Sequence, residues 1–236
     1  MSEQNLSEDR VLTDKRISVF TGHFGSGKTE ISVNYAFLLK KLGFNVAIVD
    51  LDVVNPYFRT AYVRKQLLSA GIKVIAPINS GTNAEAITLS SEINSVFRDK
   101  QLRVIFDVGG DESGARVLSV YKDQLNLDDY DIFMVVNPKR SMTDTAEKII
   151  KMLDAVELSL GLKVSGLIAN AHLLEETSIK DVREGYSISV EVSRRTSVPI
   201  KAICGIYENL HGLDGKIEEK LWYIRRYIRG YGHGKS

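Results

Sequence analysis

Seven short apolar runs constrain the fold of this chain more than any other feature of its sequence. They lie at residues 16–21, 45–51, 73–76, 103–108, 131–136, 164–169 and 200–205. Each run is apolar almost throughout, whereas a strand with one face in water alternates apolar and polar residues. The runs therefore predict strands that are buried on both faces, which is typical of a parallel sheet covered by helices on both sides.

Longer stretches with helical spacing separate the apolar runs. We expect helices at residues 28–42, 60–69, 85–97, 115–124, 143–160, 179–195 and 216–229. Strand and helix alternate without a repeat, a low-complexity tract or a proline-rich linker between them. The sequence thus predicts the α/β class, with a single doubly wound, mostly parallel sheet flanked by helices.

The two ends of the chain differ from its centre. Residues 1–15 are polar and charged, so we expect a flexible N-terminal arm, with the domain at 16–236. The C-terminal helix predicted at 216–229 has a basic, aromatic character and an apolar stripe. Such a helix can lie on a membrane, but it follows the last strand directly and is interpreted as a packed helix that closes the sheet.

The composition excludes several functional classes. Among 236 residues, 31 Lys and Arg stand against 30 Asp and Glu, a net charge of +1, which gives no signature of a nucleic-acid partner. The basic pairs Lys139-Arg140 and Arg194-Arg195 are interpreted as solvated surface. The single cysteine, Cys204, cannot form a disulfide within the chain. No apolar run is long enough to span a membrane and the N-terminus is unlike a signal peptide, so we expect a cytoplasmic protein.

The first apolar run leads into a glycine-rich loop that is typical of phosphate binding. A G-x-x-x-x-G-K-T pattern stands there between a strand and a helix. Glycines let backbone N–H groups turn toward a polyanion, and the N-terminus of the helix adds a favourable dipole. Lys28 is expected to reach the β- and γ-phosphates, and the Thr29 hydroxyl to coordinate Mg²⁺. The residues expected to bind a nucleotide here are Gly22, His23, Phe24, Gly25, Ser26, Gly27, Lys28, Thr29 and Glu30.

Aspartates end two further predicted strands. Asp50 and Asp52 end the second apolar run, and they share a face because alternate residues of a strand point the same way. Asp107 ends a later run in the pattern of apolar residues before an aspartate, known as Walker B. The carboxyl ends of parallel strands form the ligand-binding edge of such sheets. We expect Asp50 and Asp107, together with Thr29, to hold Mg²⁺.

With these motifs, residues 16–210 resemble the MinD/ParA/CobQ-type P-loop ATPases, the SIMIBI class that includes the nitrogenase iron protein. The resemblance implies that Asp52 orients or activates the attacking water and that Lys28 acts with it in catalysis. It implies that Gly110, after Asp107, contacts the γ-phosphate. It also implies that Asn170 contacts adenine, although a strand-end turn explains this asparagine almost as well.

Other residues indicate which nucleotide the chain binds and which members of the family it resembles. A guanine-reading N-K-x-D or T-K-x-D motif is missing, because 137–140 reads NPKR and 170–173 reads NAHL, so ATP is favoured over GTP. A lone cysteine, Cys204, is interpreted as a buried apolar residue, and we expect no iron–sulfur cluster. Histidines 172, 211 and 233 have no metal-ligand spacing and receive no role.

Two departures from the family pattern leave questions open. His23 stands where the family carries a second lysine that usually reaches the nucleotide of a partner subunit. Imidazole is shorter and not reliably charged at pH 7, so an ATP-dependent homodimer stays open. In the segment 53–59, Tyr57, Phe58 and Arg59 follow a turn in the place of switch I. Arg59 neutralises phosphate charge, or Tyr57 and Phe58 form a docking surface that responds to the nucleotide. The alternative is that Tyr57 and Phe58 fill the core while Arg59 keeps its charge in water.

These observations predict an Mg²⁺-dependent protein that binds ATP and ADP, hydrolyses ATP slowly and acts as a nucleotide-controlled switch. Its protein client is unknown, and no strong nucleic-acid or membrane signal is present. One alternative is an ATP-dependent kinase or amidase that acts on a small molecule, of the CobQ or dethiobiotin-synthetase type. Another is a nucleotide-binding scaffold that does not hydrolyse.

Overall fold

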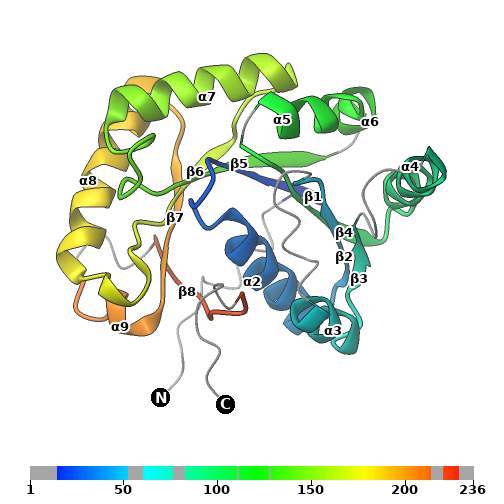
Figure 1. The fold of residues 1–236 in the computed structure, drawn as a ribbon, viewed down its shortest axis with the longest axis horizontal. Helices are drawn as coiled ribbons and strands as arrows, with labels where there is room; N and C mark the ends of the chain where they lie inside the picture. The colour runs from blue at the N-terminus through cyan, green and yellow to red at the C-terminus, as the bar shows by residue number, and fades with distance from the viewer. Residues whose placement is uncertain are drawn as a thin grey trace.

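A computed structural model describes residues 15–52, 61–76, 83–110, 112–127, 129–213 and 220–228 of the chain. These residues form one eight-stranded sheet in which all neighbouring strands run parallel. The strand order is β3-β2-β4-β1-β5-β6-β7-β8, with helices on both faces (Figure 1). The predicted doubly wound α/β fold is therefore confirmed.

The elements follow the predicted alternation closely. The strands are β1 Ile17–Thr21, β2 Asn45–Asp50, β3 Lys73–Ile75, β4 Leu102–Asp107, β5 Tyr130–Val136, β6 Gly166–Ala169, β7 Ile200–Gly205 and β8 Leu221–Tyr223. The helices are α2 Lys28–Lys41, α3 Ala61–Ser69, α4 Asn83–Arg98, α5 Glu112–Ser119, α6 Lys122–Asn126, α7 Ala146–Leu160, the 3₁₀ turn η2 Leu174–Glu176, α8 Ile179–Thr196 and α9 Tyr207–Leu210. The N-terminal arm, apart from Lys15, and the segment 53–59 lie outside the described residues.

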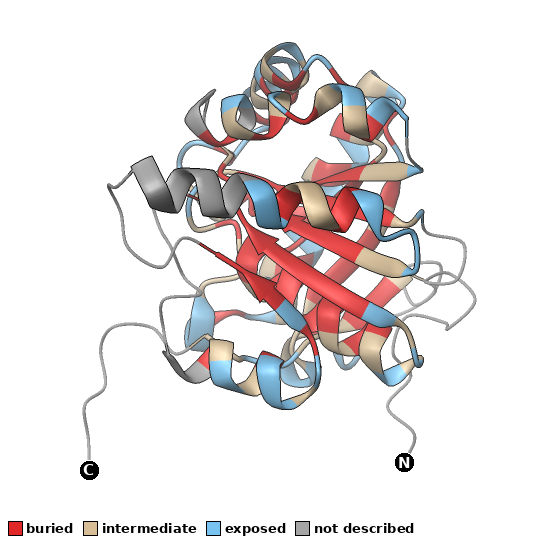
Figure 2. Ribbon diagram, turned by 90° about the vertical axis from the view of Figure 1, so that its right-hand side faces the viewer, coloured by how far each residue is buried: buried red, intermediate tan, exposed pale blue. Residues whose placement is uncertain are grey.

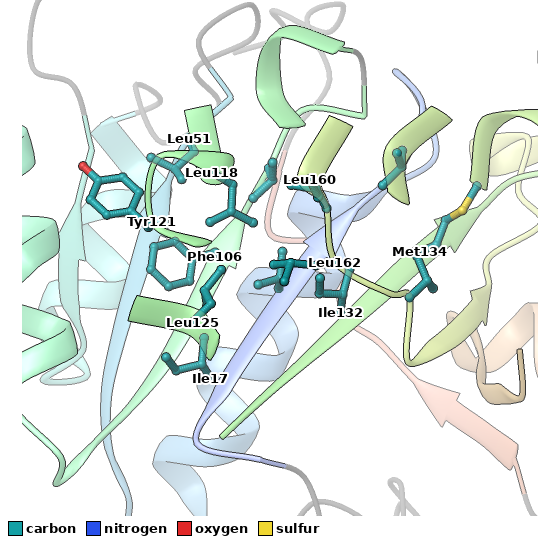
Figure 3. Close-up of a cluster of buried hydrophobic side chains, with 14 of the residues drawn as sticks. Ile17, Leu51, Phe106, Leu118, Tyr121, Leu125, Ile132, Met134, Leu160 and Leu162 are labelled. Atoms are coloured by element: carbon teal, nitrogen blue, oxygen red, sulfur yellow. The ribbon is translucent and has the colours of Figure 1, made fainter. Parts of the chain in front are cut away.

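The helices divide between the two faces of the sheet. The side chains of α4, α5, α6 and α7 share one apolar cluster with β1, β2, β4 and β5, and those of α2 and α3 share another on the opposite face. Figure 2 shows the central strands buried along most of their length, as their apolar sequences require. Figure 3 shows Phe106 of β4 in the first cluster, near Leu118 and Tyr121. Burial of these apolar side chains is the main stabilising contribution.

The single helix predicted at 115–124 is wrong. The structure has two shorter helices, because α5 ends at Ser119 and α6 starts at Lys122. The turn between them buries Tyr121, whose ring stacks on Phe97 of α4 at 5.8 Å between ring centroids. The sequence alone could not show that this aromatic pair favours a turn over a continued helix.

The C-terminal helix predicted at 216–229 is also wrong for the described part of that segment, residues 220–228. Leu221–Tyr223 instead forms β8, which pairs with β7 so that Trp222 lies opposite Cys204. Trp222 and Cys204 are both buried, and the ring of Trp222 contacts the edge of the Tyr35 ring on α2. Within the part of the chain that the structure describes, no helix is both long and apolar enough to cross a bilayer.

Residues 224–228, which we call the C-terminal strap, lie along α2 instead of forming a helix. The Asn34 side chain donates to the carbonyl of Arg225 and accepts from its N–H, each at 2.8 Å. The Glu30 carboxylate accepts the backbone N–H groups of Tyr227, at 2.6 Å, and Ile228, at 3.1 Å. These bonds use backbone groups that a helix would pair internally. Side chains of α2 therefore hold the strap in an extended form.

We expect Asn34→Ala to lower the free energy of unfolding by about 2 kcal/mol, because it leaves both half-buried backbone groups of Arg225 without their partner. The measurement is urea unfolding followed by circular dichroism. Asn126→Ala, at the exposed end of α6, is the matched control and should change stability by less than about 0.5 kcal/mol. Equal midpoints for the two variants would mean that Asn34 does not hold the strap.

Candidate functional site

The candidate site lies at the carboxyl edge of the sheet, around β1. The strands on either side of β1 are β4 and β5, and the chain winds outward in opposite directions from this point. Crevices at such a reversal are where ligands bind in open α/β sheets. The loop after β1 therefore meets the loops after β4, β5 and β6, and each contributes contacts described below.

The glycine-rich loop after β1 is packed too tightly for larger residues at several positions. A Cβ atom on Gly110, in the loop after β4, would lie 2.0 Å from the Gly22 carbonyl oxygen. A Cβ atom on Gly27 would lie 2.3 Å from Nδ2 of Asn170, and Gly27 has a left-handed φ of +88°. Backbone of the loop after β4 therefore contacts backbone of the glycine-rich loop, and the Asn170 side chain packs on Gly27. Gly110, predicted to contact the γ-phosphate, adjoins the first residue of the glycine-rich loop.

Lys28 and Asp52 form a buried ion pair at the start of α2. Nζ of Lys28 lies 2.8 Å from Oδ2 of Asp52, and both side chains are almost completely buried. The backbone N–H of Asp52 donates to Oδ1 of Asp50 at 3.0 Å, which fixes the turn after β2. The two residues predicted to act in catalysis are thus in direct contact.

Asp107 lies level with Asp50, because the two residues are partners in the register between β2 and β4. Ser32 on α2 donates to Oδ1 of Asp107 at 3.4 Å. Burial raises the pKa of Asp107 to about 6, although Lys28 and the hydroxyl of Thr29 oppose this rise. Within the described residues, Oδ2 of Asp107 is buried without a hydrogen bond. A cation beside this oxygen would replace the missing interaction.

The loop after β6 supports the glycine-rich loop from one side. Nδ2 of Asn170 donates to the carbonyl of Ser26 at 2.7 Å, and Asn170 is buried. This bond places the residue predicted to contact adenine directly on the glycine-rich loop. Nε2 of His172, two residues later, is buried and has no hydrogen bond with the described part of the chain. Burial, with help from Arg140 and Arg226, lowers the pKa of His172 to about 4, so the ring is neutral at pH 7.

The loop after β5 supports the same glycine-rich loop from another position. Nδ2 of Asn137 donates to the carbonyl of Gly25 at 3.3 Å, and Nε of Arg140 donates to that same carbonyl at 3.2 Å. The interpretation of Arg140 as solvated surface is therefore wrong. Asn137, Arg140 and His172 are site residues that the sequence analysis missed. The one signal in the sequence was that Asn137 and Arg140 follow a predicted strand, at the edge where such sheets bind ligands.

Three predicted nucleotide-binding residues, two in the glycine-rich loop and one on α2, have side chains that are exposed or already hydrogen-bonded elsewhere in the protein. Nδ1 of His23 lies 2.9 Å from the carbonyl of Phe24, and the ring of Phe24 is exposed. The carboxylate of Glu30 holds the C-terminal strap. Any contact of Glu30 with a nucleotide is thus left to its backbone, near the N-terminus of α2.

We expect Gly110→Ala to lower affinity for nucleotide by about tenfold or more, because the new methyl group would push the loop after β4 away from Gly22. Titration calorimetry with Mg·ATP measures this change. Gly166→Ala is the control, since its Cβ atom would meet neighbours only at ordinary contact distance, from 3.4 Å. Wild-type affinity in Gly110→Ala would show that the close contact does not shape the site.

Solved structures share this architecture at low sequence identity. The chain is similar to the cell division protein FtsY from Thermotoga maritima, with a TM-score of 0.57 and 19% identity, over 88% of this chain and 67% of that one. It is similar to chloroplast FtsY from Physcomitrella patens, with a TM-score of 0.56 and 17% identity, over 89% and 62%. FlhF complexed with GTP/Mg²⁺ gives a TM-score of 0.53 and 13% identity, over 80% and 65%. The chain thus spans about two thirds of the length of each.

Sequence comparison gives a more specific result. No curated protein matches the chain significantly. The family model described as the CobQ/CobB/MinD/ParA nucleotide binding domain matches residues 17–202, which include the glycine-rich loop, both aspartate-ended strands and the loops after β5 and β6. The predicted resemblance is confirmed, and this chain belongs to the CobQ/CobB/MinD/ParA nucleotide-binding domain family.

Proposed function

We propose that this chain is an Mg²⁺-dependent ATP-binding protein that hydrolyses ATP slowly and acts as a nucleotide-controlled switch for a partner protein. The observation that carries the proposal is the buried ion pair between Lys28 and Asp52. A nucleotide phosphate competes for the same ammonium group, because Lys28 is the phosphate-binding lysine of the motif. Phosphate binding therefore releases Asp52, and the state of the nucleotide is reported by a protein carboxylate.

The released carboxylate is suited to position water for hydrolysis. Asp52 follows β2 at the edge where β4 ends in Asp107, and its backbone N–H is fixed by Asp50. Phosphoryl transfer needs mainly positioning and neutralisation of charge. In this proposal Lys28 and the loop amides neutralise the phosphates, and Asp52 orients the attacking water. The release of Asp52 from Lys28 would then signal the nucleotide state to a partner protein through the segment that follows Asp52.

The donor set beside the loop fits Mg²⁺. The carboxylate of Asp107 and the hydroxyl of Thr29 are oxygen ligands of the kind that Mg²⁺ prefers, and Mg²⁺ takes its other ligands from water and phosphate. Oδ2 of Asp107, buried without a hydrogen bond from the described residues, supports this assignment. Asp50 is proposed as a further ligand on its register position beside Asp107. Bound Mg²⁺ would neutralise charge on the phosphates.

ATP is proposed as the nucleotide because the loop after β6 lacks a carboxylate for guanine. Asn170 is followed by Ala171, His172 and Leu173, none of which is acidic. FlhF, a structural neighbour, is known in complex with GTP/Mg²⁺, but its identity to this chain is only 13%. The amide of Asn170 donates to the glycine-rich loop, so its carbonyl oxygen is the group left to accept from the adenine amino group.

We expect Asp52→Ala to reduce ATP turnover by about a hundredfold, because no carboxylate would position the water. ATP affinity should stay equal or rise, since Lys28 no longer has to leave a carboxylate. Phosphate release measures the first change and titration calorimetry the second. Asp154→Ala, on the exposed side of α7, is the control and should match the wild type in both. Unchanged turnover in Asp52→Ala would support a nucleotide-binding scaffold that does not use Asp52.

We expect ATP to drive formation of a homodimer in which the switch state is read. Light-scattering mass is measured without nucleotide, with Mg·ADP and with Mg·ATP, on the wild type and on Asp52→Ala, which retains ATP. A doubled mass with Mg·ATP alone would agree with a switch despite His23. One mass in all states would exclude this dimer and favour the kinase or amidase alternative.

A further inference from the structure

Arg140 is held directly against the glycine-rich loop. Besides the bond from its Nε atom to the carbonyl of Gly25, its side chain lies along this glycine. A Cβ atom on Gly25 would come within 3.1 Å of Nε and within 3.6 Å of both Cδ and Cζ. The arginine is half-buried, so part of its side chain is covered by the protein and not by solvent.

The segment that carries Arg140 is braced at both ends. The Asn137 side chain joins it to the neighbouring loops, because it donates to the carbonyls of Gly25 and His172 and accepts from the N–H of His172. The hydroxyl of Thr143 donates to the carbonyl of Asn137 at 2.7 Å. A buried and bonded turn of this kind fixes the direction of its side chains. Arg140 is therefore preorganised toward the loop before any ligand arrives.

Arg140 and its neighbour Lys139 differ in whether a carboxylate pairs with their positive charge. Lys139 is neutralised by two carboxylates, with Nζ lying 2.6 Å from Asp181 and 2.7 Å from Glu184. Within the described part of the chain, no carboxylate forms an ion pair with Arg140. A guanidinium keeps its charge at every physiological pH, and a half-buried charge without a counter-ion is costly. This arrangement is suited to an anion that comes from outside the chain.

We propose that Arg140 binds the phosphate chain of the nucleotide held by the glycine-rich loop of its own subunit. The inference rests on the proposed nucleotide binding and adds a second cation to Lys28. Guanidinium groups bind phosphate oxygens through paired N–H donors, and Nε is already used on Gly25, so the two terminal nitrogens remain for the ligand. The bond to Gly25 ties the arginine to its own loop, which favours the nucleotide of the same subunit over that of a partner.

Among the described residues, the two histidines near the loop do not supply this charge. His23 is turned toward the carbonyl of Phe24, and His172 is neutral at pH 7. The positive charge of Arg140 is one of the causes that lower the pKa of His172. The electric field of Arg140 therefore acts on the loop after β6, which carries His172. A polyanion bound at the loop would experience the same field as an attraction.

Three variants at position 140 separate the charge of Arg140 from its hydrogen bond to Gly25. Arg140→Ala removes both, Arg140→Gln keeps a donor near the position of Nε without the charge, and Arg140→Lys keeps the charge. Lys139→Ala is the matched control, because it removes a cation whose charge is already neutralised. Titration calorimetry measures the affinity for Mg·ATP, Mg·ADP and inorganic pyrophosphate at several salt concentrations, and urea unfolding checks that each variant folds.

We expect Arg140→Ala and Arg140→Gln to bind all three probes about tenfold or more weakly, with a shallower salt dependence, since a charged hydrogen-bond donor is lost. Arg140→Lys should recover part of the affinity, and Lys139→Ala should bind like the wild type. Full recovery by Arg140→Gln would overturn the proposal and leave Arg140 a structural role. Unchanged affinity in all variants would overturn it too. Absence of ATP binding by the wild type would instead reject the proposed function itself.

Discussion

The buried contact between Lys28 and Asp52 is the interaction on which the rest of the candidate site depends. Taking two charges out of water is expensive, and their attraction repays the cost only in good geometry. A pair of this kind contributes little net stability, but removal of one partner takes away a charge that balances the other. A phosphate that takes over Lys28 must therefore also release Asp52 to a new partner. The proposed exchange would give the site two defined states, which is the requirement for a switch.

The sheet supports the candidate site because it brings together the short loops that follow its central strands. β1 has β4 on one side and β5 on the other, so the loops after all three strands meet where Gly110, Gly22 and Gly25 lie. Backbone atoms of Gly22 leave no space for a Cβ atom at Gly110, and the side chain of Asn170 leaves none at Gly27. The loop is thus supported from several directions before a ligand binds, which lowers the entropic cost of binding.

The sequence predicted the sheet and the order of its elements because each strand is an apolar run buried on both faces, a signal that is local and strong. Local motifs also singled out Lys28, Thr29, Asp52 and Asp107. The structure places Lys28 in contact with Asp52 and Asp107 beside Asp50, and the roles assigned to these residues stay predictions. It failed at the C-terminus, where β8 is three residues long and its Trp222 packs on Tyr35 of α2, far away in the chain. It missed Arg140 for the same reason, because nothing in the NPKR string shows which of its two cations meets a carboxylate and which meets the glycine-rich loop.

The C-terminal strap joins the sheet to the loops of the candidate site. It follows β8, which extends the sheet beyond β7, and it returns along α2 to bond with Glu30 and Asn34. Its Arg226 also forms an ion pair, at 2.6 Å, with Glu175 in the loop after β6. One short segment thus connects the helix that begins at Lys28 with the loop that carries Asn170. Any movement of the start of α2 relative to the loop after β6 must therefore strain or release the contacts of this strap.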